Sequence, residues 1–355
     1  MSHSCKEKEM IKFLFLVILS AFVIIYSRQT GDSVRSSITF AVTTVIPALF
    51  PFMVLSRMIA SSDALQYILS PSEKLTVKLF NISCNGMIPV IIGFLTGFPI
   101  GAVTVCEKYK KGEYSKDEAE RLLALSHNTG PSFPIGFIGI QLWGSARFGL
   151  FLYLSQIIPW LLATTLWKGR YKAERTQTSA VNGKRRGSLI IQITDAVSSA
   201  ALASISVAAF TVFFGFCLGA IDILMPKMTF SARAFMSSLL ELTDGCCYAA
   251  RLGGTVGCAL TGFAVGFGGL SALMQASSAA CVQGLSVKTL IRIKLISGIV
   301  CALLAAGYYI CFPIEAESVF APASLSVDTP VLQCITIVAI ISILFIFLTK
   351  DFKRR

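Results

Sequence analysis

Two stretches of this sequence place glycine, proline and polar residues inside otherwise apolar segments. The first is GFLTGFPIGAVTV, residues 93 to 105, and the second is SHNTGPSFP, residues 126 to 134. Glycine and proline weaken a helix by about 1 and 3 kcal/mol relative to alanine. An interrupted helix leaves backbone N–H and C=O groups free to bind a solute where the interruption lines a cavity. The two stretches therefore predict a binding site built on broken helices.

Polar residues beside such breaks are the candidate solute ligands. The sequence LLELTDGCC, residues 239 to 247, adds a carboxylate next to a glycine, and GFGGLSALMQ, residues 266 to 275, adds a serine and a glutamine. The candidates are Thr96, Gly97, Pro99, Asn128, Thr129, Gly130, Glu241, Thr243, Gly245, Ser271 and Gln275. Close helix packing through small residues is the alternative role for the glycines.

Glu241 has two interpretations that the sequence leaves open. A carboxylate at membrane depth costs roughly 2.5 to 3.5 kcal/mol, so one placed there is a functional residue by default. A carboxylate in water at the membrane interface needs no such explanation.

The remaining reactive residues predict neither catalysis nor metal binding. Most of the eleven cysteines lie inside apolar segments, and the chain has two histidines, His3 and His127, to which we assign no role. No nucleophile, base and metal ligands fall near one depth, so we expect no enzyme activity, disulfide framework or cofactor. A coupling ion, sodium or a proton, stays open.

Composition indicates the setting of these residues. Of the 355 residues 54% are hydrophobic and 14% are charged, and the mean hydropathy is +0.72, whereas soluble domains carry about 25% charged residues. The chain is therefore predicted to be an integral membrane protein in contact with the lipid bilayer. Its predicted spans are 11–27, 39–59, 147–167, 193–221, 295–311 and 331–349.

The basic residues predict the orientation. The net charge of +12 does not indicate nucleic-acid binding, because Lys and Arg gather at membrane edges. Residues 168 to 187 hold seven Lys or Arg and one Glu, whereas all the charged residues of 312–330 are acidic. The positive-inside rule then places both termini and the central loop in the cytoplasm. Residues 11–27 are expected to be an uncleaved helix, because the sequence that follows the apolar run lacks a signal-peptidase site.

An internal repeat is predicted from GFLTGF at 93–98 and GFAVGF at 262–267. The spans 39–59 and 193–221 would cross in opposite directions, so the fold class is an all-α polytopic membrane protein with two inverted repeats, re-entrant hairpins and discontinuous helices. The connectors around Gly112 and Gly284 are then expected on opposite sides of the membrane. The predicted parts are an N-terminal helix and connector (1–37), the first repeat (38–167), a basic cytoplasmic linker (168–192), the second repeat (193–311) and an outer loop, last helix and basic tail (312–355).

The motifs GFPIGA, KKGEYSKDEAERLLALSHNTGP, ELTDG and GFGGLSALMQ, taken in order, resemble those of the YlbJ group of sporulation integral membrane proteins. This group lies in the nucleoside-recognition, or Gate-domain, superfamily, and the resemblance covers roughly residues 35 to 310. It implies an organisation similar to concentrative nucleoside transporters. It also implies a bacterial membrane protein, in sporulating cells in the outer forespore membrane.

The resemblance implies transport of a small organic solute, with dipicolinic acid first. Dipicolinate is a rigid dianion that two helix N-termini could seat, although Glu241 fits it poorly unless it is protonated or turned away. A nucleoside would use Glu241, Asn128 and Gln275 more naturally. A nucleoside or other metabolite transporter and a non-transporting membrane scaffold are therefore alternatives, and the oligomeric state is open.

Overall fold

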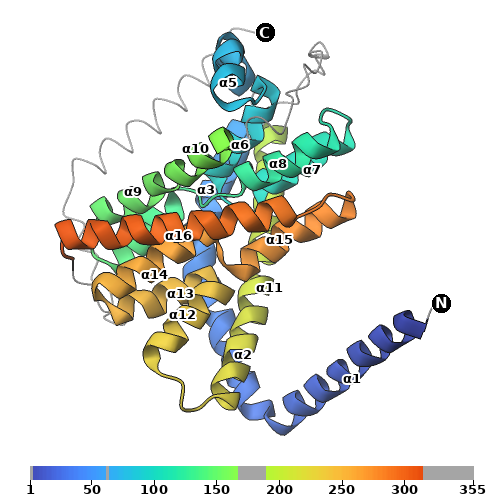
Figure 1. Ribbon diagram of the computed structural model, residues 1–355, viewed down its shortest axis with the longest axis vertical. Helices are drawn as coiled ribbons and strands as arrows, with labels where there is room; N and C mark the ends of the chain where they lie inside the picture. The colour runs from blue at the N-terminus through green and yellow to red at the C-terminus, as the bar shows by residue number, and fades with distance from the viewer. Residues whose placement is uncertain (1–2, 61–63, 167–188, 315–355) are drawn as a thin grey trace. The chain divides into compact units, whose positions relative to one another are not determined.

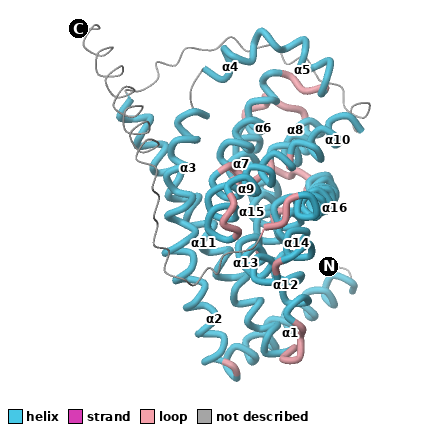
Figure 2. Tube along the Cα trace, turned by 90° about the vertical axis from the view of Figure 1, so that its left-hand side faces the viewer, coloured by secondary structure: helices cyan, strands magenta, loops and turns pink. Residues whose placement is uncertain are grey.

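The computed structural model describes residues 3–60, 64–166 and 189–314, and this part of the chain is helical without a β-strand. Figure 2 shows the helices joined by short loops. The prediction of an all-α protein is confirmed. The predicted span 331–349, the basic segment 168–187 and almost all of 312–330 lie outside the described residues.

Thirteen helical elements lie in the described residues before position 167 (Figure 1). They are α1 (His3–Ile25), α2 (Ser27–Phe40), the π-helical η1 (Ala41–Val45), α3 (Ile46–Ala60), α4 (Ala64–Leu69), the 3₁₀ turn η2 (Ser70–Ser72), α5 (Glu73–Phe80), α6 (Cys84–Thr96), α7 (Ile100–Lys110), α8 (Lys116–Ser126), the π-helical η3 (Ser132–Leu142), α9 (Ala146–Ser155) and α10 (Ile157–Leu166).

The helices after residue 188 are α11 (Leu189–Leu224), α12 (Phe230–Leu240), α13 (Leu242–Leu252), α14 (Gly254–Phe267), α15 (Gly269–Val282) and α16 (Lys288–Cys311).

Several helical stretches are long and apolar enough to cross a bilayer, which needs about 20 residues. Among the described residues there are five: Ser27–Ile59, Ala146–Thr165, Leu189–Leu224, Gly254–Val282 and Lys288–Cys311. The helical stretch Tyr67–Phe80 and helix α6 (Cys84–Thr96) together form a sixth candidate, with a bend of 85° between them. Four of the spans predicted from the sequence fall on these stretches, and large apolar side chains such as Leu202 and Phe213 lie exposed on α11, where lipid can cover them. The chain is an integral membrane protein.

Side-chain caps explain where several helices begin. At each of these starts an oxygen accepts a hydrogen bond from the backbone N–H three residues later, which satisfies a group without an intrahelical partner. The capping residues are Ser83, Ser115, Ser145, Thr229 and Glu241.

Glycines in the two GFxxGF motifs have different roles. Gly93 lies against the backbone of Ser126, and Gly266 lies against Ser297, so both allow neighbouring helices to approach closely. Gly97, in contrast, ends α6 with a φ of 79°. Helix packing, the alternative role, therefore accounts for Gly93 and Gly266, whereas Gly97 also forms the turn that ends α6.

The two connectors that were predicted on opposite faces lie together. The backbone N–H of Ser286, just before α16, donates to the Glu120 carboxylate in α8 at 2.8 Å. Figure 1 shows the α7–α8 and α15–α16 turns on the same side of the ribbon. The prediction that Gly112 and Gly284 lie on opposite sides of the membrane is therefore wrong. The motifs GFLTGF and GFAVGF matched α6 with α14, but α6 is the first helix of a hairpin and α14 is the first part of a broken span.

The opening helices of the two halves run antiparallel. Gly215 of α11 lies against Ser37 and Gly219 lies against Ser33, so residue numbers rise along one helix as they fall along the other. Further along, the Ser204 hydroxyl lies 3.7 Å from the Met53 sulfur.

Candidate functional site

The first helix hairpin, α6–α7, turns at Gly97–Pro99. Gly97 has a positive φ of 79°, which side chains rarely adopt, and α7 begins after Pro99. Carbonyl groups near the end of α6 accept hydrogen bonds from hydroxyl groups of other elements. The Tyr153 hydroxyl donates to Phe94 O at 3.0 Å, and the Ser56 hydroxyl donates to Leu95 O at 3.1 Å. These hydrogen bonds satisfy backbone carbonyls beside the hairpin tip, which lipid could not do.

The second break separates α8 from η3 over residues 127–131. The Asn128 side chain turns back and donates to Leu125 O at 2.8 Å, which caps α8. The Thr129 N–H donates to the Gln156 side-chain oxygen at 2.9 Å, and the Gln156 amide donates to Thr129 O at 3.5 Å. One side chain from the α9–α10 junction therefore serves both backbone groups in the middle of the break.

The second hairpin, α12–α13, turns at Glu241, whose backbone is extended. The Glu241 carboxylate accepts from the Asp244 N–H at 2.8 Å and from the Thr243 hydroxyl at 3.2 Å. A negative charge at a helix N-terminus is stabilised by the helix dipole. Glu241 is only 4% exposed, and its carboxylate caps its own helix.

The fourth break separates α14 from α15 at Gly268 and Gly269, whose φ values are 90° and 75°. No side chain caps the start of α15, and none caps the start of α7. Both helices therefore begin with backbone N–H groups that lack a side-chain acceptor.

Each hairpin tip touches the break of a neighbouring span through glycine. A Cβ placed on Gly97 would lie 2.8 Å from Gly130 N, and one placed on Gly269 would lie 2.9 Å from Leu242 N. His127 joins the two halves: its ring stacks on Phe98 with centroids 5.1 Å apart, and its Nε2 lies 3.5 Å from a Cβ built on Gly268.

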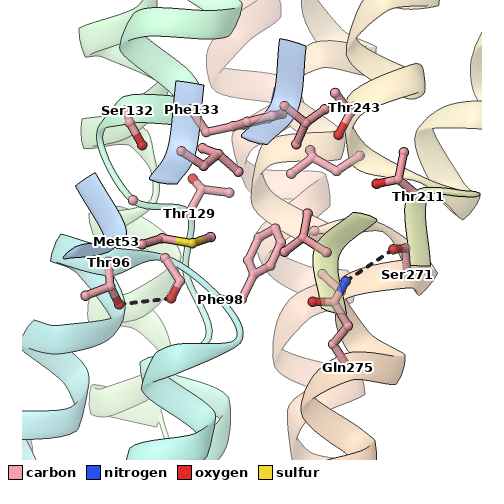
Figure 3. Close-up of a pocket in the computed structure, with 18 of the residues that line it drawn as sticks. Met53, Thr96, Phe98, Thr129, Ser132, Phe133, Thr211, Thr243, Ser271 and Gln275 are labelled. Atoms are coloured by element: carbon pink, nitrogen blue, oxygen red, sulfur yellow. Dashed lines mark hydrogen bonds between the residues drawn. The ribbon is translucent and has the colours of Figure 1, made fainter. Parts of the chain in front are cut away.

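All four breaks line one pocket, whose empty space is about 570 Å³ with the part open to solvent included. Figure 3 shows Thr96, Thr129 and Ser132 across the pocket from Thr243, Ser271 and Gln275. The pocket therefore presents polar groups from both halves of the protein to one shared space.

Two buried polar atoms of the pocket, Thr129 Oγ1 and Gln275 Oε1, have no hydrogen-bond partner among the residues that the structure describes. Thr129 is 2% exposed and Gln275 is 5% exposed, and the Gln275 amide donates to Ser271 Oγ at 3.5 Å. Unpartnered polar atoms in such surroundings carry a free-energy cost of about 1–3 kcal/mol each, which a ligand can remove.

Most of the candidates from the sequence meet in this pocket. Those that line it are Thr96, Gly97, Thr129, Gly130, Glu241, Thr243, Ser271 and Gln275. Three candidates do not: Pro99 precedes the first turn of α7, Asn128 caps α8, and Gly245 packs against the Ser238 backbone where α12 and α13 cross.

Other lining residues were not predicted. Phe98 adjoins predicted residues, and Ser132 and Phe133 follow the predicted Gly130 by two and three positions, so their nearness to the breaks was a usable signal. Met53 and Thr211 come from the unbroken parts of α3 and α11, and no local pattern marks them. Glu241 is the only charged residue among those that line the pocket. Within the described ranges no group of three or more His, Cys, Asp or Glu residues could hold a metal ion.

The fold and the pocket define an α-helical integral membrane protein whose four helix breaks meet at one pocket. No protein-family model and no solved structure matches the chain. Over 138 residues it is 23% identical to the sporulation integral membrane protein YlbJ of Bacillus subtilis (strain 168), a stretch of 39% of this chain and 34% of that protein. The match thus spans about a third of the relative's length, and it agrees with the resemblance in the motifs.

Proposed function

We propose that this protein is a membrane transporter of a small organic solute and that the pocket at the four helix breaks is its binding site. The observation that carries the proposal is the convergence of these breaks on one pocket, with the buried Thr129 Oγ1 and Gln275 Oε1 unpartnered. Interrupted membrane helices place backbone groups where a solute can use them. A scaffold protein has no need of such an arrangement.

Alternating access follows from treating the two halves as inverted units. Each half has an opening helix, a hairpin, a broken span and a returning span, in that order: α2–α3, α6–α7, α8–η3 and α9–α10, then α11, α12–α13, α14–α15 and α16. The antiparallel contacts of α2–α3 with α11 support the inversion. In transporters of this kind one unit moves against the other around a fixed site.

Dipicolinic acid is the first candidate solute, and its transport would belong to spore formation at the outer forespore membrane. The motif resemblance suggests it, and the pocket supports it in two ways. The uncapped start of α15, at Gly268 and Ser271, lines the pocket and favours a carboxylate, while Phe98 and Phe133 can contact an aromatic ring. The Glu241 carboxylate, bound to α13, is turned to its own helix, which reduces the conflict with an anion.

A nucleoside is the second candidate, because Gln275 Oε1 is a free acceptor for a donor group of the ligand. Two of the side chains that would serve a nucleoside are already engaged, however. Asn128 caps α8 and Glu241 caps α13. Of the three side chains expected to serve a nucleoside, Gln275 is the one whose acceptor atom is not engaged.

Uptake into vesicles that contain the purified protein tests the proposal, with labelled dipicolinate and labelled nucleosides compared. Thr129→Val and Gln275→Leu remove the unpartnered polar atoms and keep the side-chain shape. Each should weaken solute affinity about 3- to 10-fold, because a hydrogen bond is worth about 0.5–1.5 kcal/mol. Thr165→Val, at an exposed position of α10, is the matched control and should transport at the parental rate.

No uptake of either solute by well-folded parental protein would contradict the proposal and favour the scaffold. Nucleoside uptake without dipicolinate uptake would replace the first candidate by the second. Parental rates in both variants would move the binding site away from this pocket.

A further inference from the structure

The helical stretch Tyr67–Phe80, which contains α5, turns sharply away from α6. The bend between this stretch and Cys84–Thr96 is 85°. Helix α6 runs inward, because its start lies beside the charged α7–α8 connector and its end, at Gly97, lines the pocket. A stretch at nearly a right angle to α6 therefore runs along the end of the helix bundle. Figure 2 shows α4 and α5 at one end of the described helices.

Contacts at the end of the stretch place it at the level of the membrane surface. The Phe80 ring packs on Trp160 with the ring centroids 5.0 Å apart, and Trp160 lies five residues before the end of the membrane span Ala146–Thr165. At the start of α6, Asn85 Oδ1 accepts a hydrogen bond from Lys108 Nζ of the connector helix α7 at 2.6 Å. An aromatic ring of a span and a charged connector thus meet at this junction, as they do where hydrocarbon gives way to water.

Three hydrogen bonds hold the bend. Arg121 of α8, which is 4% exposed, donates to Phe80 O at 2.6 Å and to Asn81 O at 2.7 Å. The Glu73 carboxylate accepts from the Cys84 N–H at 2.6 Å. This last bond engages the acidic residue of α5 at the N-terminus of α6, where a negative charge is stabilised. The remaining charged residues of α5 are both lysines.

The exposed face of α5 has a basic flank and an apolar flank. Residues four apart share a helix face, so Lys74 and Lys78 form one row and Leu75 and Leu79 form the neighbouring row. All four side chains are exposed, Leu75 at 56% and Leu79 at 45%, whereas Thr76 on the inner side is buried. Such a face lets a helix lie in the membrane interface, with its apolar row toward the acyl chains and its basic row at the headgroups.

We propose that the stretch Tyr67–Phe80 is a docking surface for acidic phospholipids of the bilayer. Leu75 and Leu79 enter the outer part of the acyl region, and Lys74 and Lys78 contact the lipid phosphates. None of these side chains lines the solute pocket, so the docking surface is independent of the function proposed above.

Charge determines which lipid this surface prefers. The leucine row can enter any fluid bilayer, because burial of apolar area does not depend on the headgroup. The lysine row adds affinity where the headgroups are negative, by about fivefold for each lysine near the surface. Concentrated salt screens this part of the attraction and leaves the apolar part in place.

Amide hydrogen exchange of the peptides that cover residues 67–80 tests the docking surface. The purified full chain is placed in nanodiscs of phosphatidylcholine with or without phosphatidylglycerol. The acidic lipid should slow exchange in these peptides at least about fivefold, and concentrated sodium chloride should remove the difference. Inorganic phosphate added to the phosphatidylcholine discs should change nothing, which separates a lipid headgroup from a free phosphate.

Paired lysine variants locate the effect. Lys74→Gln combined with Lys78→Gln should lose most of the slowing that phosphatidylglycerol causes. Lys110→Gln combined with Lys111→Gln is the matched control, because it removes two exposed lysines from the α7–α8 connector, and it should keep the slowing. All four lysines are exposed, so neither pair of changes should prevent folding.

The leucine row has its own test. Leu75→Ser combined with Leu79→Ser should speed exchange of residues 67–80 in both kinds of disc, since it removes the apolar area that enters the acyl region. If this variant does not accumulate, the lysine variants decide the question.

Equal exchange of the parental protein in the two kinds of disc would overturn the proposed surface. An undiminished effect of phosphatidylglycerol after the loss of Lys74 and Lys78 would overturn it as well. Slowing by inorganic phosphate would assign the lysines to a free anion instead. Slow exchange that requires two copies of the chain in one disc would assign the face to a contact between copies.

Discussion

The two pairs of hairpin and broken span differ in how they satisfy the backbone that they expose. In the first pair, α6–α7 with α8–η3, Asn128 caps α8 locally, but the other partners of the exposed backbone come from other elements: Tyr153 and Ser56 at the end of α6, and Gln156 in the five-residue break 127–131. The second pair, α12–α13 with α14–α15, opens at single residues and glycines.

The second pair supplies its own partner, the Glu241 carboxylate on α13. A wide break in a membrane helix needs polar side chains brought by tertiary packing, because lipid cannot hydrogen-bond the exposed groups. A narrow glycine break needs little help. The first pair is therefore expected to depend on distant residues and the second on local ones.

The largest effect is expected where glycine holds a tip against a break. Gly97→Ala and Gly269→Ala should each destabilise the protein by about 2–4 kcal/mol, from the positive φ and from a Cβ pressed against backbone. Gly112→Ala and Gly284→Ala have similar φ values and open space around the new Cβ, so about 1–2 kcal/mol is expected. Thermal unfolding of the detergent-purified variants measures the difference, and equal losses at all four sites would show that the tip contacts do not matter.

Gln156→Leu tests the dependence of the first break on a distant residue. It leaves Thr129 N–H and C=O unpaired, at about 1–3 kcal/mol for each group. Gln141→Leu, at an exposed position of η3, is the control and should change stability little. The same unfolding measurement applies, and a parental midpoint for Gln156→Leu would mean that another group serves the break.

Glu241→Ala tests the local cap of the second pair, with an expected loss of about 0.5–2 kcal/mol in thermal stability. Thr229→Ala removes the corresponding cap of α12, which is exposed, so water replaces part of it and the loss should be smaller. A larger loss at Thr229 would contradict the importance of burial at the tip.

The smallest effect is expected in the α7–α8 connector, outside the membrane spans. Burial acts to raise the pKa of the Glu113 carboxyl. The Lys108 ammonium, whose Nζ lies 2.6 Å from Glu113 Oε2, outweighs this through its hydrogen bond and charge, so the pKa lies below its ordinary value of 4.5. A carboxyl whose pKa is lower in the folded than in the unfolded state stabilises the fold at pH values above its unfolded-state pKa. This stabilisation is lost as the pH falls through the folded-state pKa. Glu113→Gln should therefore lower the thermal midpoint slightly near neutral pH, and the difference from the parental protein should shrink as the solution is acidified below pH 4.5. A difference that is constant with pH would mean that the ion pair is not its source.

Local sequence was sufficient for those features that depend on composition and on single residues. The apolar runs predicted helices across the membrane, because a helix is the way a chain pairs its own backbone in lipid. Glycine and proline at 97–99 and 130–131 and the glycines at 266–269 predicted three of the four breaks, and polar residues beside them predicted much of the pocket lining. The span Gly254–Val282 was missed because Gly268 divides its apolar pattern.

Tertiary structure decided what depends on residues far apart in the chain. Asn128 was predicted as a ligand, but an amide beside a helix end can bond its own helix, and only packing determines which bond forms. The repeated motifs GFLTGF and GFAVGF aligned Gly93 with Gly262. Both glycines pack against neighbouring helices, and the breaks that correspond in the two halves lie at other positions. Met53 and Thr211 reached the pocket because α3 and α11 pack beside the breaks. The sequence by itself determined a membrane protein with interrupted helices, while the meeting of four interruptions at one pocket follows from long-range helix packing, which no short stretch of sequence encodes.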